Sequence, residues 1–331
     1  MLKSLHNKVF QFFLIILFFV IVISFSPFIG SQSIDYHNVL AYLNGEANPD
    51  GIIFFKIRLP RVLFAVITGA SLAVAGVIFQ AILRNPLATP YTLGVSAGGA
   101  LGAVIMIKLG IAFTFWGFTT IQTTAFVGSL LTITLVYYLS RREGKISIYS
   151  MILAGVTISY FFGAIILMLH FIADFTETRQ MIRWMMGGLD LFDYHIFIRV
   201  IPILLFSYIM IFLQAKKLNI ISTSEEIALS KGVSVASVQR IAFLFASLIT
   251  GLVVALSGPI GFIGLIVPHF LRLLLGVDHR YLIPASLFFG GAFLALCDVI
   301  ARTIIAPVDV PVGIITAILG GPFFLWLLVK R

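Results

Sequence analysis

The stretch RLPRVLFAVITGASLAVAGVIFQAILRNPLATP, from Arg58 to Pro90, decides the fold of this chain. Its middle part, residues 62–83, contains no formally charged side chain, and Gln80 is its most polar residue. As an α-helix, these residues would extend about 33 Å, which is long enough to cross the hydrocarbon core of a bilayer. Small residues near its centre would let another helix approach closely. The stretch therefore predicts a packed membrane-spanning helix with an arginine near each end.

The composition of the whole chain agrees with this interpretation. Of its 331 residues, 60% are hydrophobic and only 11% are charged. A soluble protein of this length could not bury so much apolar surface, so the composition indicates a polytopic membrane protein. The net charge of +9 then fits Lys and Arg in loops on one side of a membrane better than a nucleic acid partner. Cys297 is the only cysteine, which excludes an intrachain disulfide and a cysteine-based metal site.

Apolar runs predict an all-α transmembrane bundle of about ten spans, organised as a single domain over residues 1–331. The first span is expected to stay uncleaved, because it is long for a signal peptide and lacks a small-residue cleavage site. If both termini are cytoplasmic, the inner segments carry 14 of the 22 Lys and Arg residues and four of the 13 acidic ones. This asymmetry is what the positive-inside rule requires. The spans are expected at residues 9–29, 61–83, 91–108, 119–139, 149–171, 195–213, 241–257, 262–276, 283–301 and 312–329.

The third predicted span carries glycines at every fourth position. Gly94, Gly98 and Gly102 would lie on one face of a helix, and small residues at this spacing favour close helix packing. The alternative is a helix that lines a translocation pathway or moves during transport. Because glycine is frequent in membrane helices generally, packing is the favoured interpretation.

The segment GPIGFIG, which contains Gly258, Pro259 and Gly261, should break a helix. Proline removes a backbone donor, and glycine relaxes the chain. Irregular backbone at membrane depth is tolerated only where it is buried in protein or lines a water-filled cavity, so we expect the break inside the bundle. Before it, the sequence QMIRWMM predicts a short surface helix that ends at Gly187 and Gly188.

Residues 216–240 form the longest predicted connection on the inner side. Thr223 to Glu226 is expected to be a capping box that opens a short helix, and Gly232 is expected to end it. Ser234 would cap a second short helix, VASVQR. A helix–glycine–helix projection of this kind could fit a groove on a cytoplasmic partner. An ordinary amphipathic connector is the alternative.

Three arginines stand at the predicted outer ends of spans, against the inside bias of the other basic residues. Arg58 and Arg61 precede the second span, and Arg302 follows the ninth. A guanidinium is always charged and binds carboxylates through two hydrogen bonds, so these residues could receive acidic groups from a partner. The local alternative is an ion pair between Asp298 and Arg302, which are four residues apart on one helix.

Several motifs are absent. The sequence contains no G-x-x-x-x-G-K-[ST] phosphate loop, no G-x-S-x-G and no H-E-x-x-H. Most histidines fall in loops or near span ends, which predicts no metal site and no cofactor. A secondary transporter driven by an ion gradient would place acids at mid-span or use a broken-helix ion site, and GPIGFIG keeps that alternative open. A membrane-embedded enzyme would need clustered His, Asp or Cys, which the sequence lacks.

The order of motifs resembles the permease subunits of bacterial importers for iron-siderophores, haem and vitamin B12, the FecCD family of type II ABC importers. The resemblance covers nearly the whole chain. It is carried by RLPR, RNPLATPYTLGVSAGGALGA, WMMGGL, GPIGFIGLIVPHFLRLLLGVDHRYLIPAS and CDVIARTIIAPVDVPVGIITAILGGPFF.

The resemblance implies a non-enzymatic transport subunit in the bacterial cell (inner) membrane. Its implied partners are a second permease, identical or homologous, two ATP-binding subunits and a substrate-binding protein. The path would lie between the two permeases. The family motifs follow architecture rather than cargo, so haem, several siderophores, cobalamin and molybdate remain open. The resemblance also implies residue roles: Arg58, Arg61 and Arg302 in docking of the binding protein, and Glu226, Ala228, Gly232, Val233 and Ser234 in coupling to the ATPase.

Overall fold

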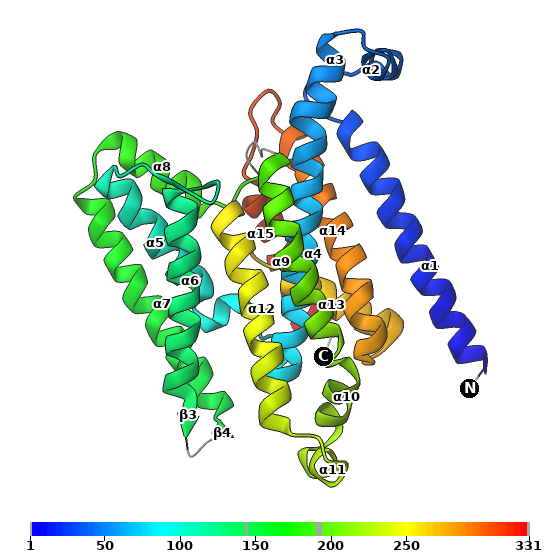
Figure 1. The fold of residues 1–331 in the computed structure, drawn as a ribbon, viewed down its shortest axis with the longest axis vertical. Helices are drawn as coiled ribbons and strands as arrows, with labels where there is room; N and C mark the ends of the chain where they lie inside the picture. The colour runs from blue at the N-terminus through cyan, green and yellow to red at the C-terminus, as the bar shows by residue number, and fades with distance from the viewer. Residues whose placement is uncertain (1, 143–144, 190–193, 330–331) are drawn as a thin grey trace.

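The computed structural model describes residues 2–142, 145–189 and 194–329, and it confirms the predicted all-α transmembrane bundle (Figure 1). Among these residues, seven helices are long and apolar enough to cross a membrane, and three shorter apolar helices accompany them. Together they coincide with the ten predicted spans. They are α1 Leu2–Phe25, α4 Leu59–Ile82, α5 Val95–Leu109, α6 Thr120–Ser140, α7 Ile148–Phe171, α9 Tyr194–Phe212, α12 Val235–Ser257, α13 Ile263–Leu275, α14 His279–Thr303 and α15 Val312–Val329.

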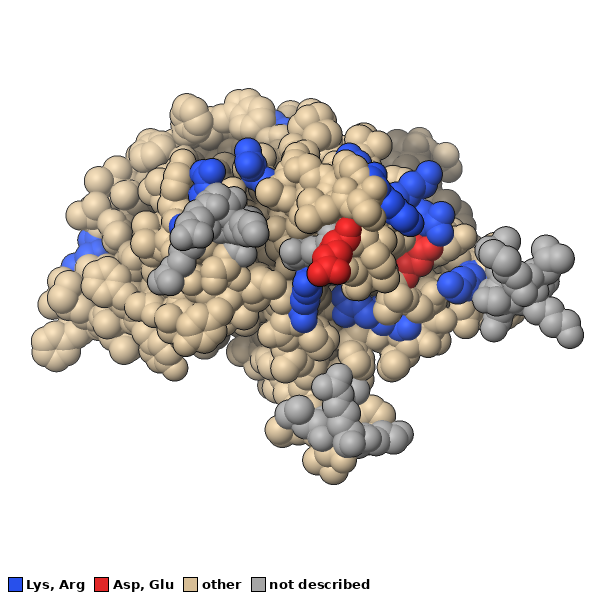
Figure 2. Space-filling view, turned by 90° about the horizontal axis from the view of Figure 1, so that it is seen from below, with Lys and Arg blue, Asp and Glu red and all other residues tan. Residues whose placement is uncertain are grey.

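Short elements cover the two ends of the bundle. We call the end with α2, α3 and α8 the upper face and the end with α10 and α11 the lower face (Figure 1). Many Lys and Arg side chains gather on the lower face (Figure 2). The short elements are η1 Ser26–Phe28, α2 Tyr36–Leu43, α3 Pro49–Ile52, the π-helix η2 Ile53–Arg58, η3 Pro90–Leu93, β1 Thr114–Phe115, β2 Phe118–Thr119, β3 Arg141–Arg142, β4 Lys145–Ile146, α8 Phe175–Met185, α10 Ala215–Thr223 and α11 Glu225–Ser230.

Helix α4 is the centre of the bundle and packs against α12, α13 and α14. Two glycines let its backbone meet neighbouring backbones directly. A Cβ added to Gly69 would lie 2.2 Å from the carbonyl oxygen of Gly290, and one added to Gly76 would lie 2.0 Å from that of Gly264. Since both obstacles are backbone atoms, no larger residue fits at these crossings.

Helices α5, α6, α7 and α8 form a second group, and α12 lies between this group and α4 (Figure 1). Two of the predicted glycines lie where α5 meets α6. A Cβ on Gly98 would come within 2.5 Å of the Gly128 oxygen, and one on Gly102 within 2.3 Å of the Thr124 oxygen. Gly94 instead precedes α5 with φ +77°, a conformation that suits glycine. The structure therefore places Gly98 and Gly102 in helix packing and Gly94 at a helix start.

The structure differs from the predicted spans at two places. The third span is not one helix from residue 91, because η3 forms first and the chain turns at Gly94. The second span is longer than residues 61–83, because α3, η2 and α4 form one helical segment, Pro49–Ile82. Asn48 starts this segment by accepting a hydrogen bond from the backbone N–H of Gly51 at 2.7 Å.

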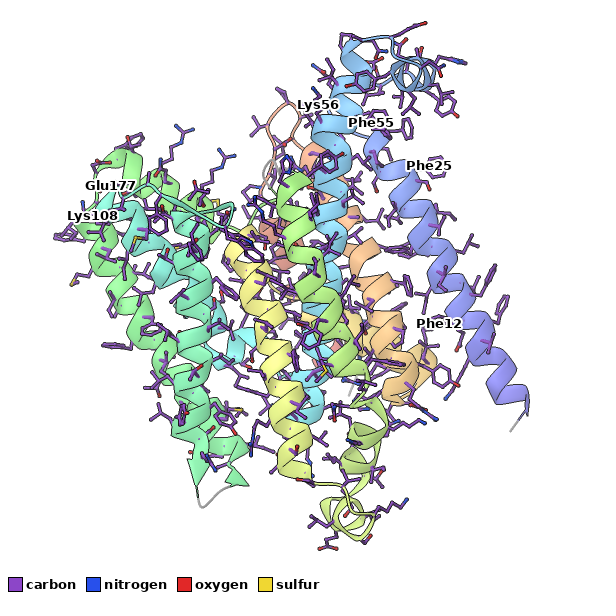
Figure 3. The ribbon with its side chains drawn as sticks, in the orientation of Figure 1. Phe12, Phe25, Phe55, Lys56, Lys108 and Glu177 are labelled. Carbon is purple, nitrogen blue, oxygen red and sulfur yellow. The ribbon has the colours of Figure 1, made fainter. Side chains whose placement is uncertain are left out.

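Aromatic contacts attach the edges of the bundle. Phe55 stacks on Tyr42 with ring centroids 5.5 Å apart and holds α2 beside η2 above the bundle (Figure 3). Phe12 of α1 meets Phe288 of α14 edge to face at 6.2 Å. Such aromatic pairs add about 0.5–1.5 kcal/mol beyond the area that they bury. Helix α1 is otherwise largely exposed, so this seam is its main attachment to the bundle.

Candidate docking and coupling sites

The first candidate site is a cluster of ionic side chains near the upper face. Arg61, in the first turn of α4, lies between two carboxylates from distant parts of the chain. Its Nε donates to Asp298 Oδ1 of α14 at 2.8 Å, and its NH1 donates to Asp309 Oδ2, in the connection before α15, at 2.5 Å. Asp298 is fully buried, whereas the side chain of Asp309 is half exposed. One guanidinium therefore bridges a buried acid and a surface acid.

Arg302 lies one helical turn beyond Asp298 and is only 4% exposed. Its Nε approaches Asp298 Oδ2 at 3.3 Å, and its NH2 donates to the backbone oxygen of Ser26 at 3.0 Å. The local pair that the sequence offered as an alternative is thus present. It shares Asp298 with Arg61, and it fastens α14 to the end of α1.

Arg58 is also buried, at 6% exposure. Its guanidinium donates to backbone oxygens of the segment that follows α1, including Phe28 at 3.0 Å and Gln32. A Cβ added to Gly30 would lie 2.7 Å from this guanidinium, so the glycine makes room for it. Arg58 therefore secures the chain that connects α1 to α2.

Two of the three arginines that the sequence suggested for docking, Arg58 and Arg302, are buried in this structure. They are buried because unpaired carbonyl groups at the end of α1 supply acceptors, which a sequence pattern does not reveal. Arg61 borders a surface pocket of about 350 Å³, which Arg183, Asp309 and Pro311 also line. An acidic partner could reach this side of the cluster.

The predicted helix break lies inside the bundle. Gly258 adopts φ +67°, and the segment that follows it is non-helical until α13 begins at Ile263. Ile260 is completely buried, and the Tyr91 hydroxyl satisfies both its backbone groups: the hydroxyl donates to the Ile260 oxygen at 2.6 Å and accepts from its N–H at 2.9 Å. The backbone here is irregular but satisfied by protein, as membrane depth requires.

The break contacts the end of α8, where the predicted surface helix is confirmed. Gly187 follows α8 with φ +70°, and an added Cβ would lie 2.2 Å from the Pro259 oxygen. The N–H of Gly188 donates to Ser257 at 2.8 Å, and that of Gly313 donates to Gly187 at 3.1 Å. Three separate parts of the chain therefore meet through backbone contacts at one junction.

Three further observations bear on whether this region could bind a metal ion or carry a proton. A Cβ added to Gly261 would meet no atom within 4 Å, so this glycine borders open space. Within residues 2–142, 145–189 and 194–329, no group of three or more His, Cys, Asp or Glu side chains is arranged to hold a metal ion. The buried acid of α14, Asp298, has arginine partners, so it differs from the unpaired mid-span acid that a proton-coupled carrier would use.

The second candidate site is α11, which projects from the lower face (Figure 1). Ser224, and not Thr223, caps this helix, because its side chain accepts from the N–H of Glu226 at 3.1 Å. Thr223 instead ends α10 and donates to the oxygen of Asn219. Ser and Thr are both preferred capping residues, and Ser is the better of the two, so the observed cap agrees with the general preference.

The chain leaves α11 through a tight turn. Gly232 has φ +72°, and the Val233 N–H donates to the Ala228 oxygen at 2.8 Å. Ser234 then caps a helix as predicted, but this helix is α12 itself and not a separate short one. Ala228 is buried against the bundle, whereas Glu226 is exposed. With Ile227 42% and Leu229 64% exposed, α11 presents apolar side chains beyond the bundle.

A polar cluster that the sequence patterns above did not indicate lies at the base of this projection. Asn219 of α10 binds Asp278 and His279, which begin α14. Arg280 donates to Asp278 with its side chain and backbone, and these hydrogen bonds hold the pKa of that carboxyl well below its usual range. An Asp two residues after a helix-ending glycine, Gly276, is a recognisable N-cap signal for α14.

A bundle of apolar helices that are long enough to cross a membrane defines a polytopic membrane protein. Residues 15–330 match the FecCD transport family, and the chain belongs to that family. This confirms the resemblance seen in the motifs.

Relatives cover most of the chain. The hemin transport system permease HmuU of Yersinia pestis is 39% identical over 281 residues, which are 84% of this chain and 84% of HmuU. The cobalamin import system permease BtuC of Halobacterium salinarum is 38% identical over 85% of this chain and 74% of BtuC. Among solved structures, an inward-facing metal-chelate type ABC transporter aligns with a TM-score of 0.84 and 31% identity, covering 97% of this chain and 99% of that one.

Proposed function

We propose that this chain is the membrane-spanning subunit of an ATP-driven importer for an iron-siderophore or a related metal chelate such as haem or cobalamin. It would work in a pair of permeases, with two ATP-hydrolysing subunits at the lower face and a substrate-binding protein at the upper face. The match to the FecCD family along residues 15–330 is the observation that carries this proposal. Haem and cobalamin are the substrates in the names of two relatives.

The function is tested by uptake of labelled chelates into proteoliposomes that hold the chain together with a cognate ATPase and are supplied with a cognate binding protein. Uptake should require ATP on the side of the membrane that the lower face meets. It should continue when the proton and sodium gradients are dissipated. Gradient-driven uptake by the chain alone would instead establish the secondary-transporter alternative.

The proposed orientation places the lower face and both termini in the cytoplasm, in accord with its basic side chains (Figure 2). Single cysteines at Ala47 on the upper face and at Ser230 on α11 test it, since both positions are exposed. The native Cys297 is 1% exposed and should stay unlabelled. An impermeant reagent added outside cells should label Ala47→Cys and leave Ser230→Cys unlabelled. Labelling of both from one side would contradict the orientation.

For the ATPase contact, we propose that α11 and the turn after it dock into the nucleotide-binding subunit. The exposed Ile227 and Leu229 support this proposal, because apolar side chains on a projecting helix fit a partner better than water. Gly232 has a positive φ and open space around it, so Gly232→Val would strain the backbone without a steric clash. Gly232→Val should lower ATPase assembly, whereas Gly232→Asn should retain it, because Asn tolerates this conformation. Equal assembly of the two variants would contradict the docking role.

For the binding protein, we propose that Arg61 makes the docking contact. Arg58 would hold the backbone that follows α1, and Arg302 would hold Asp298 beside Arg61. Asp309 then occupies the position that an incoming carboxylate would take. Asp309→Asn removes this competitor and should tighten binding at low salt, whereas Asp309→Glu should not. Arg61→Glu is less informative, because it would place a second carboxylate against buried Asp298. Equal affinity of wild type and both Asp309 variants, at low and high salt, would contradict the proposal.

A further inference from the structure

Asn219 joins α10, the helix that precedes the projecting α11, to α14, and the Arg84 guanidinium also donates to the Ile221 oxygen of α10 at 3.5 Å. Helix α10 buries Leu218 and Ile221, and it lies beside the lower end of α14 (Figure 1). Between these apolar residues, Asn219 donates from Nδ2 to Asp278 Oδ1 at 2.6 Å. Its own Oδ1 accepts from the His279 N–H at 2.9 Å and lies 2.7 Å from the His279 ring Nδ1. A single amide therefore uses both its donor and its acceptor on the first turn of α14.

This first turn is a defined and rigid target. Asp278 caps α14 by accepting from the Arg280 N–H at 3.0 Å, and the Arg280 side chain holds the same carboxylate at 2.6 Å. His279 is 5% exposed. Each group that Asn219 touches is thus fixed by further contacts, so a movement of α10 would be passed to α14 instead of being absorbed by flexible side chains.

Helix α14 continues to the upper face and contains Pro284 in its second turn, where the missing backbone N–H removes one hydrogen bond of the helix. Its 25 residues extend about 37 Å. Along its length, Gly290 meets Gly69 of α4 through a backbone crossing with no room for a Cβ. At its upper end it carries Asp298 and Arg302, which bind Arg61 and the end of α1. One helix therefore links the root of α11 to the arginine cluster.

The connection from α11 to α12 differs from the contact between α10 and α14, because it is a turn at the surface. It runs through the turn at Gly232, whose surroundings are open, since an added Cβ would meet no atom within 4 Å. Val233 and Ser234 are not deeply buried. The Val233 N–H donates to the Ala228 oxygen and Val233 packs against the bundle, but this connection has no side-chain hydrogen bond like that of Asn219 to α14 among the residues described.

We propose that Asn219 is a positioning residue that couples α11 to α14, and that α14 transmits the displacement to the Arg61–Asp298 contact at the upper face. This inference rests on the proposed function, because it assumes an ATPase below and a binding protein above. It adds a specific element, α14, and a specific contact to that function. Because coupling between two binding sites is reciprocal, each partner should influence the other's binding through Asn219 to the same degree.

The test uses the full importer in lipid nanodiscs, with Asn219→Ala as the variant and Lys217→Ala as the control on the exposed side of the same helix. Two ratios are measured. The first is ATP hydrolysis with the binding protein divided by hydrolysis without it. The second is the affinity for the binding protein with a bound non-hydrolysable ATP analogue divided by its affinity without nucleotide.

In Asn219→Ala, both ratios should move toward one. The affinity ratio should do so by a factor on the order of five, which is the lower range of ordinary allosteric coupling, whereas reciprocity fixes no such factor for the hydrolysis ratio. Lys217→Ala should leave both at the wild-type values. Asn219→Ser, which keeps a short donor and acceptor, should fall between. If Asn219→Ala does not assemble, the comparison of Asn219→Ser with Lys217→Ala decides the question.

Wild-type ratios in both Asn219 variants would overturn the inference. So would equal proportional losses of stimulated and unstimulated hydrolysis, because the ratio would then be unchanged and Asn219 would only support the fold. Failure of the proposed function gives a different result: in that case the wild-type chain itself would show no stimulation by any binding protein.

Discussion

Helices α4 and α7 have nearly the same mean hydropathy and similar lengths, yet they occupy opposite environments. In the α4 segment, 83% of the most apolar 18 residues are buried, whereas in α7 the corresponding share is 17%. The side chain of Tyr160 in α7 is 79% exposed, and that of Phe64 in α4 is 1% exposed. Hydropathy therefore identifies both as membrane helices and does not say which one forms the centre.

The difference in burial between α4 and α7 comes from the contacts that their glycines make with neighbouring helices. Gly69 and Gly76 of α4 meet backbone atoms of α14 and α13 at distances that leave no room for a Cβ. In α7, Gly155 makes such a contact, but Gly163 meets nothing within 4 Å. In a membrane, lipid is as apolar as a core, so close packing decides burial. The apolar face of α7 is left for lipid or a second protein.

The largest expected effect concerns the buried acid that joins α14 to α4. Asp298→Ala removes the shared partner of Arg61 and Arg302 and leaves buried charge uncompensated, which costs about 3–5 kcal/mol. We expect poor yield and a strongly lowered melting temperature in detergent. Asp309→Ala removes the half-exposed partner of the same arginine and should cost at most about 1 kcal/mol. Similar melting temperatures of the two variants would show that the buried pair does not hold the centre together.

The next largest expected effect is on stability, and it is tested by substituting one glycine in α4 and one in α7. Gly76→Val in α4 forces a side chain against the Gly264 backbone and should destabilise by about 1–3 kcal/mol or more. Gly163→Val in α7 enters open space and should change stability by less than about 0.5 kcal/mol. Thermal unfolding followed by tryptophan fluorescence measures both. A loss in Gly163→Val as large as in Gly76→Val would contradict the assignment of α4 as centre.

A third substitution sharpens the comparison within α7 itself. A Cβ on Gly155 would lie 2.5 Å from the Thr92 oxygen in η3. The obstacle is backbone of η3, whose Tyr91 is hydrogen-bonded to Ile260, so Gly155→Val should cost about 1–3 kcal/mol. Its melting temperature should therefore fall below that of Gly163→Val. A melting temperature equal to that of Gly163→Val would contradict this contact.

The smallest effect concerns the surface ion pair that ties α8 to α5. Lys108 Nζ donates to Glu177 Oε2 at 2.7 Å (Figure 3), and this hydrogen bond lowers the pKa of Glu177. The stabilisation is therefore present above the ordinary pKa of Glu, about 4.3, and is lost as the pH falls through the lowered value. Glu177→Gln should melt slightly below wild type at neutral pH, and this difference should vanish in acid. A difference that persists or grows on acidification would contradict the role of the pair.

The places where sequence reasoning succeeded share one property: their signal is local. Apolar length predicted the ten spans, and Gly187 and Gly258 marked chain reversals because a positive φ favours glycine whatever surrounds it. Where two neighbouring residues could both cap a helix, as for Thr223 and Ser224, the choice of cap was wrong. Gly94 matched the spacing of Gly98 and Gly102 yet starts the helix instead of packing within it.

The sequence by itself determined that this chain spans the membrane, roughly where its ten spans lie, and to which family it belongs, because these properties depend on composition and short-range pattern. Only the tertiary structure decided that α4 is central and α7 peripheral, that Arg58 and Arg302 are buried on carbonyl groups more than 25 residues away along the chain, and that Asn219 meets α14. These outcomes depend on which surfaces meet, and a charge or an amide acquires its partner only when distant segments are brought within hydrogen-bonding distance.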